Sequence, residues 1–311
     1  MTGRSSVVIG TRASKLALWQ SNHVRDSLLA THPGLEVTLE RISTRGDEIQ
    51  DRPLAAIGRN SLFVAEIEEA LRSGRIRLAV HSAKDLPSTL ADDMTVVAFS
   101  RRADPRDALI SKFGTLDKLP KGARVGTSSP RRGCQLRALR PDLVTLDIRG
   151  NVDTRLAKLE KGDYDAIVLA AAGLERLGWQ QVVTEFLDTE RMVPAVAQGI
   201  LAIEARAADD DARALCAHLD DAPSRRCAEA ERAFLAAMGA GCNAPLAGFA
   251  TIDGAQLTLT AVVGAPDGRT ARVVRSGTEP TTLGRDVAAA LSSGPGGSLL
   301  AEALAAGVPP G

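Results

Sequence analysis

Short apolar runs alternate with helix-length amphipathic segments along the first two thirds of this 311-residue chain. The apolar runs predict strands over residues 7–9, 35–41, 78–80, 95–99, 124–126, 143–146, 166–169 and 200–203. The amphipathic segments predict helices that begin near Ser14 and Ser61, and others over 130–139, 152–161, 171–177 and 208–219. Strands that are each followed by a helix are typical of α/β folds with a parallel sheet and helices on both faces. We therefore expect two such βα domains.

A different pattern begins after residue 222. A helix is predicted over 225–238, and two Gly-containing turns then divide alternating apolar and polar residues into strands. We expect a three-stranded antiparallel sheet that includes 256–263 and 270–276 and is closed by a helix over 283–291. The Gly- and Pro-rich end from Ser292 is expected to be loosely held. The C-terminal part is therefore predicted to be a smaller α+β domain.

The connections between these blocks predict the domain boundaries. The Arg- and Asp-rich segment 101–107 is interpreted as a hinge-like connection, and a second connection lies near Val193-Pro194. The apolar run that follows could rejoin the first sheet. We expect a discontinuous first domain of residues 1–100 and 196–219, a second domain of residues 101–195 and a third domain of residues 222–311.

Composition limits the classes of protein and of partner. With 44% hydrophobic residues the chain can bury sizeable cores, and with 38 basic and 38 acidic residues it lacks the positive charge of a typical nucleic-acid-binding protein. The N-terminus lacks the apolar region of a signal peptide, and no segment is long enough to span a membrane. We expect a cytoplasmic protein with no nucleic-acid or membrane partner.

The four cysteines, at positions 134, 216, 227 and 242, lie far apart and form no C-x-x-C pair. This spacing indicates neither a zinc site nor a disulfide framework, so we expect reduced thiols and no metal. Cys242 differs because it lies in the small-residue turn Gly239-Ala240-Gly241-Cys242-Asn243-Ala244-Pro245 after a predicted helix. Such a turn can bring a sulfur close to a cleft, although composition alone favours an inert buried thiol.

The segment 78–87, Leu-Ala-Val-His-Ser-Ala-Lys-Asp-Leu-Pro, carries the candidate for catalysis. Its apolar start predicts a short buried strand, and Pro87 prevents a regular continuation. Asp85 therefore lies just past a strand end, with Lys84 beside it, at the edge of an α/β sheet where ligands bind. The alternative is a solvated Lys-Asp pair in a loop, which this segment alone does not exclude.

Arginines concentrate between residues 124 and 155. In Gly126-Thr127-Ser128-Ser129-Pro130-Arg131-Arg132, hydroxyls, backbone N–H groups and two guanidiniums meet at one predicted helix N-terminus. Arg149 follows the next strand, and Arg155 lies about one turn into the following helix. Arg forks favour carboxylates or phosphates, and the usual Gly-rich phosphate loops are absent, so the pattern predicts a ligand with several carboxylates. Arg137 and Arg140 fit better as helix-surface residues in ion pairs.

Four motifs together resemble one family. They are Val-His-Ser-Ala-Lys-Asp-Leu-Pro (80–87), Gly-Thr-Ser-Ser-Pro-Arg-Arg (126–132), Arg-Gly-Asn-Val-Asp-Thr-Arg (149–155) and Gly-Cys-Asn-Ala-Pro-Leu (241–246), in this order over nearly the whole chain. The chain resembles the porphobilinogen deaminase (hydroxymethylbilane synthase) family. The resemblance implies an α/β fold of three domains, of which the first two are like periplasmic binding proteins and the third is smaller. We expect a monomer.

The resemblance implies a transferase of tetrapyrrole and heme biosynthesis that removes ammonia from porphobilinogen. It would join the units head to tail on a dipyrromethane cofactor, held by Cys242 through a thioether, and water would release the linear tetrapyrrole hydroxymethylbilane. Asp85 would be the catalytic carboxylate, because an anion facing the pyrrole nitrogens stabilises the cationic azafulvene that forms when ammonia departs. The implied cofactor-binding residues are Lys84, Ser129, Arg131 and Arg132, and the implied substrate-binding residues are Arg12, Ser14, Arg149, Arg155 and Arg176.

The chain departs from the family pattern at the expected mobile loop. A lysine-bearing Gly-Gly-Lys-Gly-Leu-Phe is common there, whereas this chain has Gly58-Arg59-Asn60-Ser61-Leu62-Phe63, and Ala56 stands at another position that is often lysine. Two cationic contacts are therefore missing unless Arg59 replaces one of them. Ala240 stands where a second glycine is usual before the cysteine.

Two other classes of function stay open on the sequence. Two βα domains can form a non-catalytic anion receptor that closes on its ligand, although such receptors are usually exported. A cysteine hydrolase would need a histidine paired with its cysteine, and no motif places one there.

Overall fold

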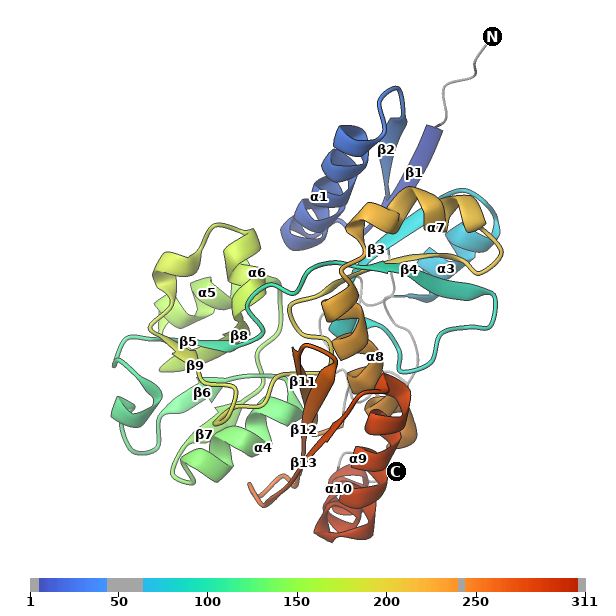
Figure 1. Ribbon diagram of the computed structural model, residues 1–311. Helices are drawn as coiled ribbons and strands as arrows, with labels where there is room; N and C mark the ends of the chain where they lie inside the picture. Colours follow the sequence, from blue (N-terminus) through green and yellow to red (C-terminus); the bar gives the residue numbers. More distant parts are fainter. Residues whose placement is uncertain (1–5, 44–63, 240–243, 307–311) are drawn as a thin grey trace.

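The computed structural model of the protein describes residues 6–43, 64–239 and 244–306. It contains two five-stranded sheets and one three-stranded sheet, with helices packed around them (Figure 1). The three-stranded sheet is antiparallel and is built from the C-terminal part of the chain. The predicted fold class, two βα units followed by a smaller α+β unit, is confirmed.

The first sheet has the strand order β2-β1-β3-β10-β4. Its strands are β1 (Ser6–Thr11), β2 (Glu36–Arg41), β3 (Leu78–Ser82), β4 (Met94–Phe99) and β10 (Leu201–Arg206), and its helices are α1 (Lys15–Thr31), α3 (Ala65–Arg72) and α7 (Asp210–Cys216), followed by the short helix η5 (Ala217–Leu219). Because β10 pairs with β3 and β4, the chain returns to this sheet after building the second one. The prediction that this run rejoins the first sheet is confirmed.

The second sheet has the strand order β7-β6-β8-β5-β9. Its strands are β5 (Asp107–Ser111), β6 (Arg124–Gly126), β7 (Val144–Leu146), β8 (Ala166–Ala170) and β9 (Glu185–Leu187), and its helices are α4 (Pro130–Leu139), α5 (Val152–Lys161) and α6 (Ala171–Arg176), with the short helices η3 (Leu116–Lys118) and η4 (Gln180–Val182). The bounds predicted for β6, α4 and α5 are confirmed. Local signals explain this success: Ser129 caps α4, and Gly162, with a φ of 88°, ends α5 in the left-handed conformation.

The third sheet is the meander β11-β12-β13. Its strands are β11 (Leu246–Asp253), β12 (Gln256–Gly264) and β13 (Thr270–Gly277), and its helices are α8 (Ala222–Ala237), α9 (Pro280–Ser293) and α10 (Pro295–Ala306). The helices α8 and α9 pack closely because Gly284 lacks a side chain, and a Cβ there would clash with the carbonyl of Ala230. The predicted antiparallel sheet is confirmed.

Two predictions about the fold were wrong. The sheets are mixed rather than parallel, because β10 is antiparallel to β3 and β4, and β5 is antiparallel to β8 and β9. The end of the chain from Ser292 is not loosely held over the described residues, because α10 forms there and buries Leu299 and Leu300. The glycines and the proline at 294–297 lie at the start of this helix, where they are tolerated, and the apolar residues after them supply the packing.

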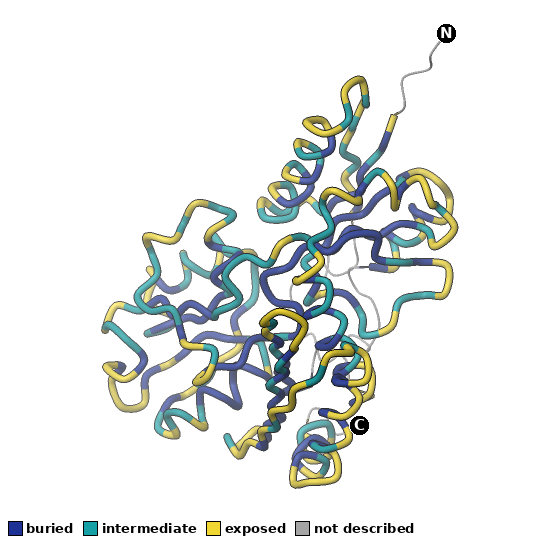
Figure 2. Tube along the Cα trace, viewed as in Figure 1, coloured by how far each residue is buried: buried dark blue, intermediate teal, exposed yellow. Residues whose placement is uncertain are grey.

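The core of the third sheet continues beneath the first sheet. Phe234 of α8 is fully buried in a cluster that also holds Ala83, Leu86 and Phe99. Figure 2 shows buried strands inside each unit and exposed outer surfaces on the helices. The residues that follow β3 therefore pack against the C-terminal unit.

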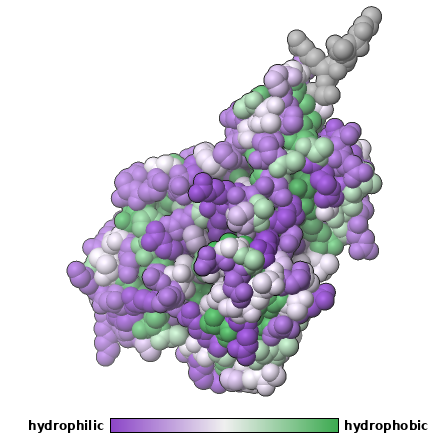
Figure 3. All heavy atoms as spheres, in the orientation of Figure 1, coloured by the Kyte–Doolittle hydropathy of each residue, from purple (hydrophilic) through white to green (hydrophobic). Residues whose placement is uncertain are grey.

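Hydrophilic residues dominate the face seen in Figure 3, where hydrophobic residues form separate patches. Among the helices of the described residues, none combines the length and the apolarity needed to cross a membrane.

Candidate active site

The strand β3 ends at the predicted catalytic carboxylate. It is followed by one 3₁₀ turn, η2 (Ala83–Asp85). Ala83 is buried, and its N–H donates to the carbonyl of Ile200 at 3.0 Å. This anchor fixes the turn, so that Lys84 is half-buried and Asp85 is exposed. The predicted position of Asp85 just past a strand end is confirmed, and an ordered turn replaces the expected loop.

Two more predicted residues lie where β1 passes into α1. Ser14 is the N-cap of α1, and its hydroxyl accepts the N–H of Ala17 at 3.2 Å. Arg12 follows β1 directly, and both Arg12 and Ser14 line the same cavity as Asp85. The start of the first helix therefore contributes to the site, as the family resemblance implied for Arg12 and Ser14.

The N-terminus of α4 carries the predicted arginine pair. Ser129 caps the helix by accepting the N–H of Arg132 at 3.4 Å. The side chains of Arg131 and Arg132 turn inward, where they are only 4% and 7% exposed and donate to the fully buried carboxylate of Asp107. Of the two arginines only Arg132 lines the cavity.

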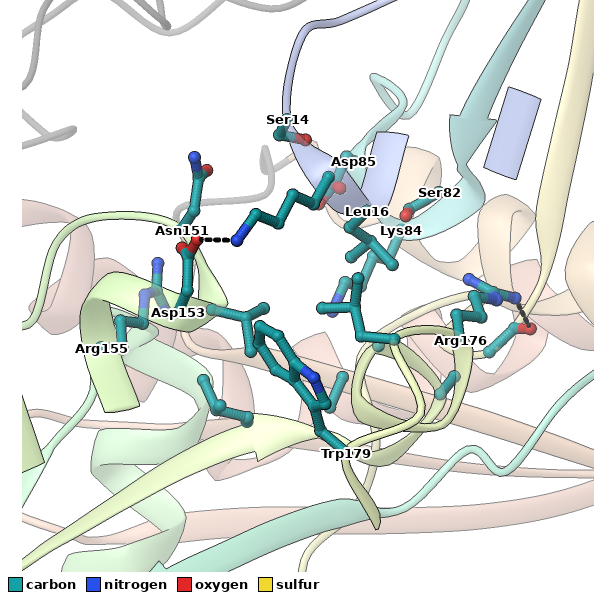
Figure 4. A pocket seen from close by; sticks show the side chains of 18 of the residues that line it. Ser14, Leu16, Ser82, Lys84, Asp85, Asn151, Asp153, Arg155, Arg176 and Trp179 are labelled. Atoms are coloured by element: carbon teal, nitrogen blue, oxygen red, sulfur yellow. Dashed lines mark hydrogen bonds and ion pairs between the residues drawn. The ribbon is translucent and has the colours of Figure 1, made fainter. Parts of the chain in front are cut away.

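These elements surround a cavity of about 270 Å³ between the first and second sheets (Figure 4). Its polar lining comes from Arg12, Ser14, Lys15, Ser82, Lys84 and Asp85 on the side of the first sheet and from Arg132, Asn151, Asp153, Arg155 and Arg176 on the side of the second. Figure 4 shows Asp85 and Ser14 across the cavity from Trp179. The structure thus brings together seven predicted site residues: Arg12, Ser14, Lys84, Asp85, Arg132, Arg155 and Arg176.

Positive charge accumulates in this cavity. Burial lowers the pKa of Lys84 to about 8, although the charge of Asp85 acts in the opposite direction. Burial also lowers the pKa of Arg176 to about 10, and burial together with the charges of Arg132 and Arg149 lowers the pKa of Arg155 to about 10. Cations that repel one another are stabilised by an anionic ligand. The cavity is therefore suited to a ligand with several carboxylates.

Three predicted site residues do not line the cavity. Ser129 acts as a helix cap, and Arg131 donates to Asp107 and to the carbonyl of Val193. Arg149 lies near enough to lower the pKa of Arg155 but is not part of the wall. Five further positions that the comparison with the family pattern singled out lie outside the described residues: Ala56, Arg59, Asn60, Ala240 and Cys242.

The three cysteines that the structure describes are buried. Burial raises the pKa of Cys134 to about 11, that of Cys216 to about 12 and that of Cys227 to about 11. Such thiols stay protonated at neutral pH, so they are poor nucleophiles. Within the described residues, no group of three or more His, Cys, Asp or Glu side chains is arranged to hold a metal ion.

The sequence reasoning missed the residues that hold the cationic side chains in place. Asp107 was assigned to a connection and Gln198 was not singled out, yet both are buried and both contact the arginine pair or its carboxylate. An available signal was the apolar run 108–110, which follows Asp107 directly and forms most of β5. An ion pair across the cavity was also missed: the Nζ of Lys15 lies 3.0 Å from the Oδ2 of Asp153 (dashed in Figure 4).

Comparisons with known proteins agree along the whole chain. Residues 7–214 match the family model described as porphobilinogen deaminase, dipyromethane cofactor binding domain. Residues 225–293 match the model described as porphobilinogen deaminase, C-terminal domain. A TRAP periplasmic solute binding protein from Desulfovibrio salexigens aligns with 12% identity and a TM-score of 0.42 over 70% of this chain and 73% of that chain, a likeness too low to support a conclusion.

Curated relatives carry the same name as the family models. Porphobilinogen deaminase from Roseiflexus castenholzii is 60% identical over 301 residues, which cover 96% of this chain and 99% of the relative. Porphobilinogen deaminase from Brevibacillus brevis is 47% identical over 299 residues, which cover 95% of this chain and 97% of the relative. The four motifs, the composition of the cavity and these full-length matches lead to one conclusion: the chain belongs to the porphobilinogen deaminase family.

Proposed function

We propose that this protein removes ammonia from porphobilinogen and joins the units head to tail, releasing the linear tetrapyrrole hydroxymethylbilane. The observation that carries the proposal is the cavity between the first two sheets, where Asp85 lies among Lys84 and four arginines, while the other carboxylate of the wall, Asp153, is paired with Lys15. Porphobilinogen has a pyrrole ring that becomes cationic when ammonia leaves and two carboxylates that need positive partners. The cavity contains groups for both requirements.

The cofactor that the family implies is dipyrromethane, and the residues present fit it. Each of its pyrrole rings carries carboxylates, and the cavity contains cations whose pKa values are lowered by burial and by one another. We propose that Lys84 and Arg132 hold its carboxylates and that Cys242 holds it through a thioether, while Ser129 and Arg131 act through Arg132. When bound, the dipyrromethane supplies the free pyrrole carbon to which the first substrate unit is attached.

We propose that Asp85 is the catalytic residue. Its carboxylate lies beside Lys84 at the surface of the cavity, where a substrate pyrrole N–H can reach it. An anion fixed at that point stabilises positive charge on the ring as the C–N bond to ammonia breaks. In its protonated form the same group can supply a proton to the leaving amine.

We propose that the substrate carboxylates are bound and oriented by Arg12, Ser14, Arg155 and Arg176. Arg149, whose charge acts on Arg155, would add to the positive potential of the cavity. Guanidiniums bind carboxylates in a fixed planar geometry, which orients the ring as well as holding it. The cationic wall is formed by residues of both sheets, so it can contact a bound ring from two sides.

We also propose that the protein works as a monomer in the cytoplasm and binds no nucleic acid. The balance of 38 basic and 38 acidic residues supports the last point. The three sheets with their helices support the division into three domains: residues 1–100 with 196–219, residues 101–195 and residues 222–311.

Intact mass spectrometry of the purified protein tests the proposal. The wild-type chain is expected to carry a covalent adduct with the mass of a dipyrromethane and to consume porphobilinogen. Cys242→Ala should lack the adduct, whereas the matched control Cys227→Ala, which changes a buried cysteine, should keep it. An unmodified wild-type chain that nevertheless forms tetrapyrrole, or an adduct that survives in Cys242→Ala, would contradict the proposal.

A further inference from the structure

The two chain segments that cross between the first and second sheets meet at one buried cluster. Asp107 starts β5, directly after the first crossing, and is 0% exposed. Gln198 lies on the second crossing, shortly before β10, and is 1% exposed. These two residues together with Arg131 and Arg132 form what we call the Asp107 cluster. It lies directly behind the cationic wall of the cavity.

Asp107 is the acceptor at the centre of the Asp107 cluster. Its Oδ2 accepts from Nη1 of Arg131 at 2.7 Å, and its Oδ1 accepts from Nη2 of Arg132 at 2.8 Å and from Nε of Arg132 at 3.1 Å. Burial acts to raise the pKa of Asp107, but the two arginines outweigh it and hold the pKa well below its usual range. The carboxylate therefore stays ionised and fixes the guanidinium of Arg132.

Arg132 keeps donors for a ligand in spite of this anchoring. A guanidinium has five N–H donors. Three of them are used by Asp107 and by the carbonyl of Val168, which accepts from Nη1 at 3.1 Å. One N–H on each terminal nitrogen remains, and Arg132 lines the cavity. The position of Asp107 therefore decides where Arg132 presents these donors.

Gln198 ties the Asp107 cluster to both crossings. Its Nε2 donates to Oδ1 of Asp107 at 3.0 Å and to the carbonyl of Pro105, on the first crossing, at 2.8 Å. The backbone around it is in the left-handed region, with φ of 56° at Ala197 and 91° at Gly199. A Cβ at Gly199 would lie 2.7 Å from the carbonyl oxygen of Ala103. The close approach of the two crossings aims the amide of Gln198 at Asp107.

The same short segment of the second crossing holds two other parts of the active site. The carbonyl of Gly199 accepts from Nη2 of Arg176 at 2.8 Å (Figure 4), and the carbonyl of Ile200 accepts from the N–H of Ala83 at the start of the turn that carries Asp85. On its other side, the N–H of Ala197 donates to the buried carboxylate of Glu231 in α8. The second crossing thus contacts three parts of the site: the Asp107 cluster, Arg176 and the turn that carries Asp85.

We propose that Gln198 and Asp107 are positioning residues. They fix the guanidinium of Arg132 relative to the two crossings, so that it can bind a carboxylate of the cofactor. The proposal deepens the proposed function and rests on it. Gln198 is the better residue to test, because removing Asp107 would leave two buried guanidiniums without their anion and would strongly destabilise the fold.

The test compares Gln198→Met with Gln135→Met in the full-length chain. Gln135 is a matched control: it is 4% exposed, lies in α4, and makes hydrogen bonds to Val193 and to the backbone of Arg131, but contacts neither Asp107 nor the cavity. Both variants lose buried amide hydrogen bonds, so urea unfolding should show similar losses of stability. The readouts are the fraction of chains that carry the adduct, by intact mass, and kcat and KM for porphobilinogen.

We expect Gln198→Met to lower the adduct-bearing fraction and to reduce kcat/KM by about tenfold or more, because Asp107 without the amide of Gln198 shifts together with the guanidinium of Arg132, which then loses one aligned contact with the ligand. Gln135→Met should keep both within about twofold of the wild type. If Gln198→Met does not fold, Gln198→Asn, which keeps the amide but shortens its reach, should show the same losses to a smaller degree. Equal behaviour of the Gln198 and Gln135 variants would overturn this proposal alone. A wild-type chain without adduct would overturn it together with the proposed function.

Discussion

Replacing Lys84 by methionine should stabilise the protein at neutral pH and weaken its ligand binding. Burial lowers the pKa of Lys84 from 10.5 to about 8, so the folded state holds this proton less tightly than the unfolded state does. The unfolded chain therefore binds more protons between about pH 8 and pH 10.5, and stability rises with pH through this window. Below it, the buried ammonium destabilises the fold.

The pKa values set the size of the effect. A lysine with these two pKa values lowers the free energy of unfolding by about 3 kcal/mol at pH 7 and by about 1 kcal/mol at pH 9.5. The first figure is an upper limit, because Lys84 is only half-buried and water screens its charge. Lys84→Met keeps most of the side-chain volume and removes the charge. It should be more stable than the parent at pH 7, with a gap that falls by about 1 to 2 kcal/mol at pH 9.5.

Urea unfolding at both pH values measures this gap. Parent and variant should both carry Cys242→Ala, so that bound cofactor does not contribute to stability. Lys121→Met, which removes the charge of an exposed lysine in the same way, provides the control for the substitution itself. A gap for Lys84→Met that is constant from pH 7 to pH 9.5 would refute the reasoning.

Three further predictions concern the catalytic group, the cavity wall and the C-terminal helix. Asp85→Asn should reduce kcat by about 10²-fold to 10³-fold and Asp85→Glu by less, in steady-state assays with porphobilinogen; an asparagine variant that retains more than a tenth of kcat would show that the charge is not required. The Lys15–Asp153 ion pair joins the two sides of the cavity at 3.0 Å, so Lys15→Glu and Asp153→Lys should each raise KM and the double variant Lys15→Glu with Asp153→Lys should restore it, with a coupling of about 0.5 kcal/mol that disappears in 1 M salt; no coupling at low salt would exclude a functional pair. Leu299→Ala should lower the free energy of unfolding by about 2 to 4 kcal/mol in urea, whereas a change below about 0.5 kcal/mol would mean that α10 is not part of the core.

The sequence predicted best those elements whose ends carry their own signals. The bounds of α4 and α5 followed from a serine N-cap and from a glycine that ends a helix in the left-handed conformation. Strand direction was predicted poorly, because β5 and β10 run antiparallel to their neighbours and an apolar run has the same composition in either direction. The C-terminal helix was missed because Gly and Pro at its start outweighed the apolar residues after them.

The site was predictable where a side chain follows a strand end or starts a helix. Asp85 was assigned to the site because it follows a strand end, whereas Arg12 and Ser14 were assigned to it through the family resemblance; the structure brings all three to one cavity. Arg131 does not line that cavity, although it is the neighbour of Arg132 in the same motif. The difference comes from the long-range acceptor Asp107, and no local pattern in the chain indicates which arginine of a pair such an acceptor turns away from the cavity.

The charge balance of the Asp107 cluster explains why the cavity favours polyanions. One carboxylate, Asp107, faces two guanidiniums, so the cluster keeps a net positive charge although it is almost fully buried. This charge contributes to the lowered pKa of Lys84, and Arg132 contributes to the lowered pKa of Arg155. A carboxylate that enters the cavity relieves all of these repulsions at once, whereas a neutral pyrrole would relieve none. We therefore expect selection by charge for each ring that binds, with a strength that depends on Asp107, because this carboxylate neutralises one of the two arginines rather than both.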